Sequence, residues 1–243
     1  RKHPSSDMLK TRIRKWCLLL LLLGCCMGVQ AQYSMGNTGL LNIPTADMQK
    51  AGTFMGGGNY LPNGMTPFNF NTGNYFVNIT FLSFLELSYR CTLLKTTRYD
   101  GKKGYFQQDR SLSARIRPIE EGKYHPAIVI GTNDPFKDTG TNYFATIYGV
   151  LTKGFSIAKG DRLALTAGYY LPLNKHSIQD GPFGGISYSP AFCREMTVIA
   201  EYDSKGFNVG AAARLWRHLS IHVFTREFNS ISGGIRYECR LLH

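Results

Sequence analysis

The sequence lacks the features by which several large classes of protein are recognised. Its 243 residues include no apolar run of the roughly 20 residues that a membrane-spanning helix needs, and helical periodicity is almost absent. Only three of its six cysteines, Cys91, Cys193 and Cys239, lie beyond residue 31, and they are far apart. An odd number of separated cysteines predicts neither a disulfide framework nor a zinc site. We therefore expect no metal and no other cofactor.

The sequence is basic, but its positive charge is not concentrated in a block. It holds 28 Lys and Arg against 16 Asp and Glu, for a net charge of +12. The first 31 residues contain six of the basic residues and one acidic residue, so the remainder carries +7. That excess is spread along the chain, and we therefore expect no nucleic acid partner.

Residues 1–31 have the order of a secretory signal peptide. A basic region comes first, then an apolar core, and then a small-x-small cleavage motif. These parts are Arg12, Arg14 and Lys15, then Leu18 to Leu23, then Val29-Gln30-Ala31. We predict export with cleavage after Ala31. An alternative stays open, because Leu22-Leu23-Gly24-Cys25 loosely resembles a lipoprotein site with Cys25 as the lipidated residue.

Beyond this leader, short stretches of alternating apolar and polar residues predict strands. In the segment 84–91, Leu85, Leu87 and Tyr89 share one face, whereas Glu86 and Arg90 share the other. Twelve such strands are predicted, at 53–60, 73–81, 84–92, 110–117, 125–132, 143–153, 162–170, 182–189, 195–203, 207–215, 218–226 and 231–240.

The connections between these strands alternate in length. Long ones at 61–72, 93–109, 133–142 and 171–181 alternate with short ones at 82–83, 118–124, 154–161 and 190–194. This rhythm is typical of the extracellular loops and periplasmic turns of outer-membrane barrels. We therefore predict an all-β fold: a 12-stranded antiparallel transmembrane barrel over residues 53–243, in the outer membrane of a Gram-negative bacterium.

A soluble β-sandwich is the alternative fold, because it also alternates and turns at similar intervals. Tyrosines near strand ends or on outer faces favour the membrane barrel, in which aromatic girdles lie at both interfaces. The tyrosines so interpreted are Tyr60, Tyr75, Tyr89, Tyr148, Tyr169, Tyr170, Tyr188, Tyr202 and Tyr237.

Charged residues on the polar faces of the strands are predicted to line the lumen. They are Glu86, Arg90, Arg115, Arg117, Glu201, Arg214, Arg236 and Glu238. Buried charges must pair, so these residues could simply brace the barrel. The alternative is a polar path or binding surface for an anionic polysaccharide, since arginine suits carboxylates.

Residues 32–52 precede the first strand and show no alternation. We predict that they form either a plug in the lumen or an ordered N-terminal clasp, with Gly39, Leu40, Ile43, Pro44 and Thr45 as the characteristic residues. The three glycines at 56–58 are expected to leave room in a crowded lumen.

A catalytic or metal site finds little support. His218 and His222 are four apart, which in a strand separates them by about 13 Å, too far for one metal ion. Ser220 shares their face, but no third residue can be assigned to orient a catalytic pair. We therefore predict no catalytic residue and no metal site.

Several segments together resemble the YjbH family of outer-membrane proteins, which is linked with exopolysaccharide or capsule production. They are GNTGLLNIPTA at 36–46, RSLSARIR at 110–117, EEGKYHPAIVIG at 120–131, FGGI at 183–186, AEYD at 200–203 and FNVG at 207–210. The resemblance runs from about 36 to 240. Larger members of the family hold two barrel-like halves, so this chain resembles a single-barrel short form.

The resemblance implies a non-enzymatic protein that assists exopolysaccharide export or surface assembly. A structural subunit of a larger outer-membrane complex is the alternative, and a barrel-embedded enzyme acting on lipid or glycan is the least favoured. The expected partners are outer-membrane lipid and lipopolysaccharide, polysaccharide, and other outer-membrane or periplasmic proteins.

Overall fold

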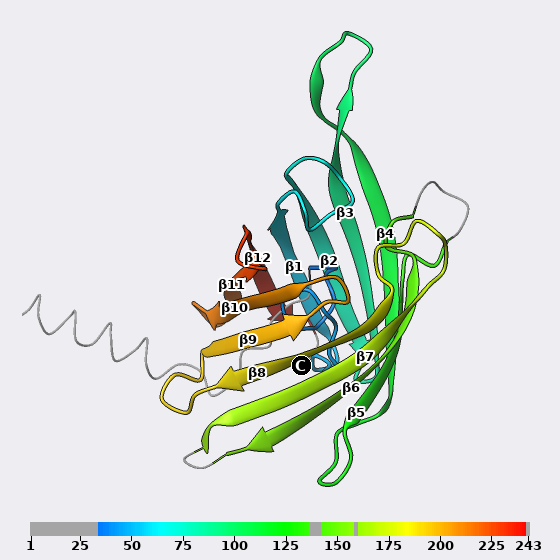
Figure 1. The fold of residues 1–243 in the computed structure, drawn as a ribbon. Helices are drawn as coiled ribbons and strands as arrows, with labels where there is room; N and C mark the ends of the chain where they lie inside the picture. The colour runs from blue at the N-terminus through cyan, green and yellow to red at the C-terminus, as the bar shows by residue number, and fades with distance from the viewer. Residues whose placement is uncertain (1–33, 137–141, 158–159, 242–243) are drawn as a thin grey trace, which may run out of the picture.

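The computed structural model describes residues 34–136, 142–157 and 160–241, which form a closed barrel of twelve antiparallel strands (Figure 1). Each strand pairs with its neighbours in the sequence, and β1 pairs with β12 to close the barrel. The strands are β1 (Thr53–Leu61), β2 (Thr72–Leu82), β3 (Leu85–Thr97), β4 (Lys103–Ile119), β5 (Ala127–Asn133), β6 (Thr146–Ser156), β7 (Arg162–Pro172), β8 (Gly181–Ser189), β9 (Met196–Tyr202), β10 (Phe207–Arg214), β11 (Leu219–Arg226) and β12 (Ser230–Arg240). The predicted fold is confirmed; the predicted leader, residues 1–31, lies outside the described residues.

The two faces of each strand meet different surroundings. On β2, Asn74, Asn78 and Thr80 are buried inside the barrel, whereas Val77 and Phe81 are exposed on its outer wall. A soluble barrel would bury its apolar side chains, so this inverted pattern excludes the sandwich and matches a wall that faces lipid. Among the described residues, no helix has the length and apolar character needed to span a membrane.

The barrel has two distinct ends. The connections 62–71, 98–102, 173–180, 203–206 and 227–229 lie at one end, here named the loop end, as do residues 134–136 and 142–145. The connections 83–84, 120–126, 190–195 and 215–218 lie at the other, here named the turn end, as do residues 157 and 160–161. Both the start of β1 and the finish of β12 lie at the turn end, because the strand number is even.

The predicted long connection at 93–109 is wrong, because most of it is strand. β3 and β4 continue past the other strands as a paired ribbon, with Leu94 opposite Gln107 and Thr97 opposite Lys103, and only residues 98–102 turn. Threonine and aromatic residues favour the extended conformation, which outweighs the glycine and aspartate that are typical of loops. The ribbon projects far beyond the barrel (Figure 1).

Tyr148 and Tyr170 are buried in the barrel, which corrects their prediction as outward residues of an aromatic girdle. Strand parity places Tyr148 on the same inward face as Thr146 and Thr152. Its ring lies over Gly131, its direct partner on β5, where an added Cβ would be 2.3 Å from the Tyr148 Cζ.

The pairing of an inward aromatic ring with a glycine recurs around the barrel. Cross-strand partners of this kind are Gly57 with Phe76 and Gly168 with Phe183, where an added Cβ would approach the ring within 2.6 Å. Gly210 is likewise paired with Phe224, and an added Cβ there would meet the Phe224 Cβ. Gly57 therefore has the role expected of the glycines at 56–58. These pairs let large rings fill a narrow interior without pushing the strands apart.

Candidate functional site

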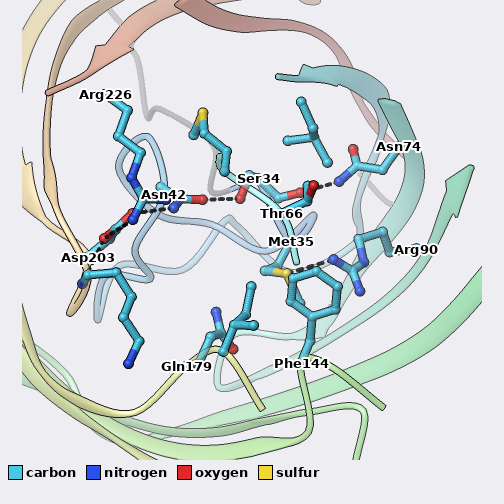
Figure 2. Close-up of a pocket in the computed structure, with 14 residues that line it drawn as sticks. Ser34, Met35, Asn42, Thr66, Asn74, Arg90, Phe144, Gln179, Asp203 and Arg226 are labelled. Carbon is cyan, nitrogen blue, oxygen red and sulfur yellow. Dashed lines mark hydrogen bonds and ion pairs between the residues drawn. The ribbon is translucent and has the colours of Figure 1, made fainter. Parts of the chain in front are cut away.

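The N-terminal segment lies inside the barrel. Residues 34–48, here named the plug segment, cross the lumen as irregular chain, and Gly39 forms an isolated bridge with Pro44 (Figure 2). Leu41, Ile43 and Ala46 have no exposed surface and pack in one cluster with wall residues such as Val129 and Tyr148. The five residues predicted to characterise this segment, Gly39, Leu40, Ile43, Pro44 and Thr45, are all buried.

Two buried carboxylates on opposite walls bind the backbone of the plug segment. Glu86 of β3 accepts hydrogen bonds from the Thr38 N–H at 2.7 Å and from the Thr38 hydroxyl at 3.0 Å. Glu201 of β9 accepts them from the N–H groups of Leu41 at 2.9 Å and Asn42 at 2.6 Å. Since β3 and β9 are six strands apart in a closed ring of twelve, the segment is held across the full width of the lumen.

Arg115 of β4 binds the carbonyl groups of the same segment. Its guanidinium donates to the carbonyl oxygens of Thr38 at 2.8 Å and Thr45 at 2.9 Å, and also to that of Asp47. It forms an ion pair with Glu86 at 3.2 Å, and both side chains are fully buried. Irregular backbone in a dry interior must find partners for its polar groups, and the wall charges supply them.

Asparagines complete the contacts, and the sequence analysis did not single them out. Asn78 donates to Glu86 and to the Gly36 carbonyl, and Asn208 donates to Glu201 at 2.9 Å. Nearer the loop end, Asn59 and Asn74 both donate to the Ser34 carbonyl. The available signal was the recurrence of asparagine at inward positions, which is uncommon in strands and gives donors and acceptors without charge.

The other predicted charged residues form separate groups. Arg90 lies toward the loop end, stacks on Phe144 at 4.0 Å and pairs with Asp109 at 3.8 Å, a partner that the sequence analysis missed. Toward the turn end, Glu238 pairs with Arg214 at 2.6 Å and Arg236 at 3.1 Å.

Arg117 lies apart from the plug segment. It sits at the turn end, where it donates to the Ser83 carbonyl and pairs with the exposed Glu120. The eight predicted residues therefore separate into a central group that holds the plug segment, two groups nearer the ends, and Arg117 at the rim.

A small cavity lies between the plug segment and the loop end (Figure 2). Its volume is about 40 Å³, room for a few water molecules. Ser34, Met35 and Asn42 form its floor, and Asn42 donates to Asp203 of the wall at 2.6 Å. Arg226 on the neighbouring wall pairs with the same Asp203 at 3.7 Å.

Asp134 lies at the loop end, directly after β5, with only 4% of its surface exposed. Burial, reinforced by the nearby charge of Asp109, raises the pKa of this carboxyl to about 6, although Arg90 opposes the shift. A carboxyl of this kind changes charge between mildly acidic and neutral pH.

The Ser220 and His222 side chains are both buried on the inner face of β11, but they do not form a catalytic pair. Among the described residues, the Ser220 Oγ and the His222 Nε2 each have no hydrogen-bond partner, whereas a nucleophile and its base would bind each other. His218 is exposed at the turn end and contacts the Glu238 carbonyl. The described residues contain no cluster of His, Cys, Asp or Glu suited to a metal ion.

Comparison with known proteins gives one family match and several distant structural likenesses. The family model described as "Exopolysaccharide biosynthesis protein YbjH" matches residues 31–171, more than half of the chain. No curated protein sequence matches. An outer membrane channel from Pseudomonas putida F1 has a TM-score of 0.43 at 10% identity, over 82% of this chain and 98% of its own.

Two outer membrane phospholipases are also similar. The Salmonella typhi enzyme has a TM-score of 0.35 at 8% identity, over 76% of this chain and 88% of its own. Phospholipase A from Escherichia coli has a TM-score of 0.37 at 9% identity, over 80% of this chain and 98% of its own. Likenesses this distant carry no functional inference.

Proposed function

The chain belongs to the YjbH family of exopolysaccharide biosynthesis proteins, and from this premise we propose that it is a non-enzymatic outer-membrane barrel that assists exopolysaccharide export or surface assembly. The observation that carries the proposal is the way the plug segment is held. Wall carboxylates and Arg115 bind its backbone, and its described residues belong to none of the twelve strands. It occupies the lumen without belonging to the sheet, so it can leave while the barrel persists.

Displacement of the plug segment frees a polar lining. Glu86, Arg115 and Glu201 then lose their backbone partners, and Asn78 and Asn208 keep only wall partners. Carboxylate, guanidinium and amide groups are the donors and acceptors that sugar hydroxyl and carboxylate groups need. The same groups that hold the plug segment are therefore suited to a glycan chain in its place.

The test joins a cellular and a physical measurement. Loss of the gene should lower the amount of exopolysaccharide at the cell surface, and the wild-type gene should restore it. In planar bilayers, deletion of residues 34–46, or Glu201→Ala should the deletion fail to fold, should raise conductance above that of the wild type. If loss of the gene leaves the amount of surface exopolysaccharide unchanged, the proposal is wrong.

A second candidate function is that of an accessory subunit in a larger outer-membrane complex. It is favoured by the complete burial of Leu41, Ile43 and Ala46, which fill the middle of the lumen and argue for a closed barrel. Purification from native outer membrane in mild detergent tests this function. Recovery of the protein without any stoichiometric partner would count against it.

A further inference from the structure

The projecting ribbon, residues 94–107 and here named the basic hairpin, lies outside the membrane. On the outer wall of β3 and β4 the continuous run of exposed apolar side chains ends at Tyr89 and Leu112; farther out, Phe106 is exposed as well, with the Arg98 guanidinium over its ring at 5.7 Å. Arg110, the next outward residue of β4, is already charged and exposed. Everything beyond it therefore lies past the apolar band that contacts lipid, and Figure 1 shows how far the hairpin extends from the barrel.

Positive charge is concentrated on the basic hairpin. It carries four exposed basic residues against one acidic residue: Lys95, Arg98, Lys102 and Lys103 against Asp100. Lys102 and Asp100 meet only at 4.0 Å with largely exposed side chains, a contact worth little in water. In the part of the chain that the structure describes, no carboxylate forms an ion pair with Lys95 or Lys103. The hairpin thus presents cationic groups to solvent.

A row of aromatic rings runs from the base of the hairpin across the loop end. Tyr105 contacts Phe70, Phe70 stacks on Phe68, and Phe68 meets Tyr143, with centroid separations of 6.3, 5.4 and 5.4 Å. The Tyr105 hydroxyl donates to the Asn71 carbonyl at 2.5 Å, which fixes the hairpin to the connection 62–71. Tyr105 remains 49% exposed, so a flat apolar face stays available beside the cationic groups.

We propose that the basic hairpin and the aromatic row together form a docking surface for an acidic polysaccharide, a glycan whose sugars carry carboxylates. The proposal rests on the proposed function and names its substrate class. Arginine and lysine bind carboxylates by charge-assisted hydrogen bonds, and aromatic faces pack against the C–H faces of sugar rings. Lipid headgroups are a poorer fit, because Arg98 and Lys102 flank the tip of the hairpin, the part farthest from the apolar band.

The test measures binding by the purified full chain in nanodiscs that contain no lipopolysaccharide. The probes are polygalacturonate, which is acidic, and dextran, which is neutral. Wild type should bind polygalacturonate and not dextran. The triple variant Arg98→Gln, Lys102→Gln, Lys103→Gln should lose at least about tenfold in affinity, the equivalent of one charged hydrogen bond or more.

A matched control removes the same charge from the opposite end of the barrel. Lys50, Lys123 and Arg217 are exposed at the turn end, and their joint replacement by Gln should leave the affinity for polygalacturonate unchanged. For the aromatic row, Tyr105→Ala should weaken binding, whereas Tyr105→Phe keeps the ring and should bind more tightly than the alanine variant. Heat-modifiable migration in gels shows that each variant is folded.

Several results would overturn the proposal. An equal loss of affinity for polygalacturonate in both triple variants would show that binding depends on net charge alone. Equal binding of dextran would remove the role of carboxylates, and capture of lipopolysaccharide without polygalacturonate would assign the surface to lipid. If the purified protein binds polygalacturonate but loss of the gene leaves surface exopolysaccharide unchanged, the proposed function is overturned and the docking surface is not. Absence of binding by wild type would overturn the docking surface whatever the cells produce.

Discussion

Glu86 and Glu201 stand on opposite walls of the barrel, and the plug segment joins them through backbone N–H groups only three residues apart, those of Thr38 and Leu41. The two carboxylates are not equivalent. Glu86 forms an ion pair with Arg115, whereas within the described residues no Lys or Arg forms an ion pair with Glu201. Glu201 is bound by the amides of Leu41 and Asn42 and by Asn208, so it depends on the plug segment more strongly.

Replacing Glu201 should therefore loosen the plug segment. In Glu201→Ala, the N–H groups of Leu41 and Asn42 lose their acceptor, and their hydrogen exchange should accelerate at least about tenfold, as expected when a local opening becomes easier by one hydrogen bond. Hydrogen exchange measured by mass spectrometry over residues 34–48 gives the result. The matched control is Glu120→Ala, which removes an exposed carboxylate at the turn end. Equal protection in wild type and Glu201→Ala would contradict the role assigned to this carboxylate.

Replacing Arg115 should destabilise the whole barrel. Arg115→Met leaves the Glu86 charge unpaired in a dry interior, together with three plug carbonyls, and should lower the free energy of unfolding by about 3–5 kcal/mol. The double variant Arg115→Met, Glu86→Gln should recover part of this loss, because the lone charge is gone. Denaturant unfolding in lipid vesicles measures both. Arg117→Met, at the exposed end of the same strand, should cost less than about 1 kcal/mol.

Asp134 should make stability depend on pH in the acid range. Because burial raises its pKa to about 6 from an unfolded value near 3.8, the folded state holds the proton more tightly. Its contribution is fully present below the unfolded pKa and is lost as the pH rises through about 6. The stability of Asp134→Asn relative to the wild type should therefore increase as the pH rises from 4 to 7, and the midpoint of unfolding measures this difference. Asparagine also tolerates the positive φ of 45° at this position. A difference between the two proteins that stays constant across this range would refute the assignment.

The glycine–aromatic pairs should be sensitive to a single methyl group. In Gly131→Ala the new Cβ collides with the ring of Tyr148, and overpacking of this kind costs about 1–3 kcal/mol. The temperature at which the folded form disappears from heat-modifiability gels should fall. Gly149→Ala is the matched control, since no atom of the described residues lies within 4 Å of an added Cβ there. In a Tyr148→Ser background, Gly131→Ala should cost less stability than it does in the wild type, because the ring with which the new Cβ collides is gone. Equal melting of the two glycine variants would argue against the pairing.

The sequence predicts the strands and their inward residues better than the contacts that those residues make inside the lumen. Alternation is a local property, so Glu86, Arg115 and Glu201 could be placed on inward faces from their immediate neighbours. Their partners could not be predicted, because the bond from Leu41 to Glu201 spans 160 residues and no periodicity encodes it. The long connection predicted at 93–109 is wrong for the opposite reason: its glycine and aspartate residues are locally typical of a loop, whereas pairing between β3 and β4 extends the ribbon through them.

Tyr148 and Tyr170 show a further limit of reading residues by type. Tyrosine suits a membrane interface, and this preference suggested an outward position. Strand parity and the space above a cross-strand glycine instead place both rings inside the barrel. The glycine that makes room for Tyr148 is Gly131, which is 17 residues away in the sequence and so is not a local signal.

The closing seam of the barrel has a consequence for the order of assembly. The Gly52 carbonyl, where the chain leaves the lumen, accepts a hydrogen bond from the N–H of Leu241, and Thr53 lies opposite Arg240. The first described part of the chain to be synthesised therefore occupies the interior, while the last strand completes the wall around it. Until β12 joins β1, the carboxylates of Glu86 and Glu201 remain open to water and are not yet committed to backbone partners. Closure of the wall and enclosure of the plug segment are therefore linked, and we expect the slowest step of maturation to be the one in which β12 docks on β1 with the plug segment inside.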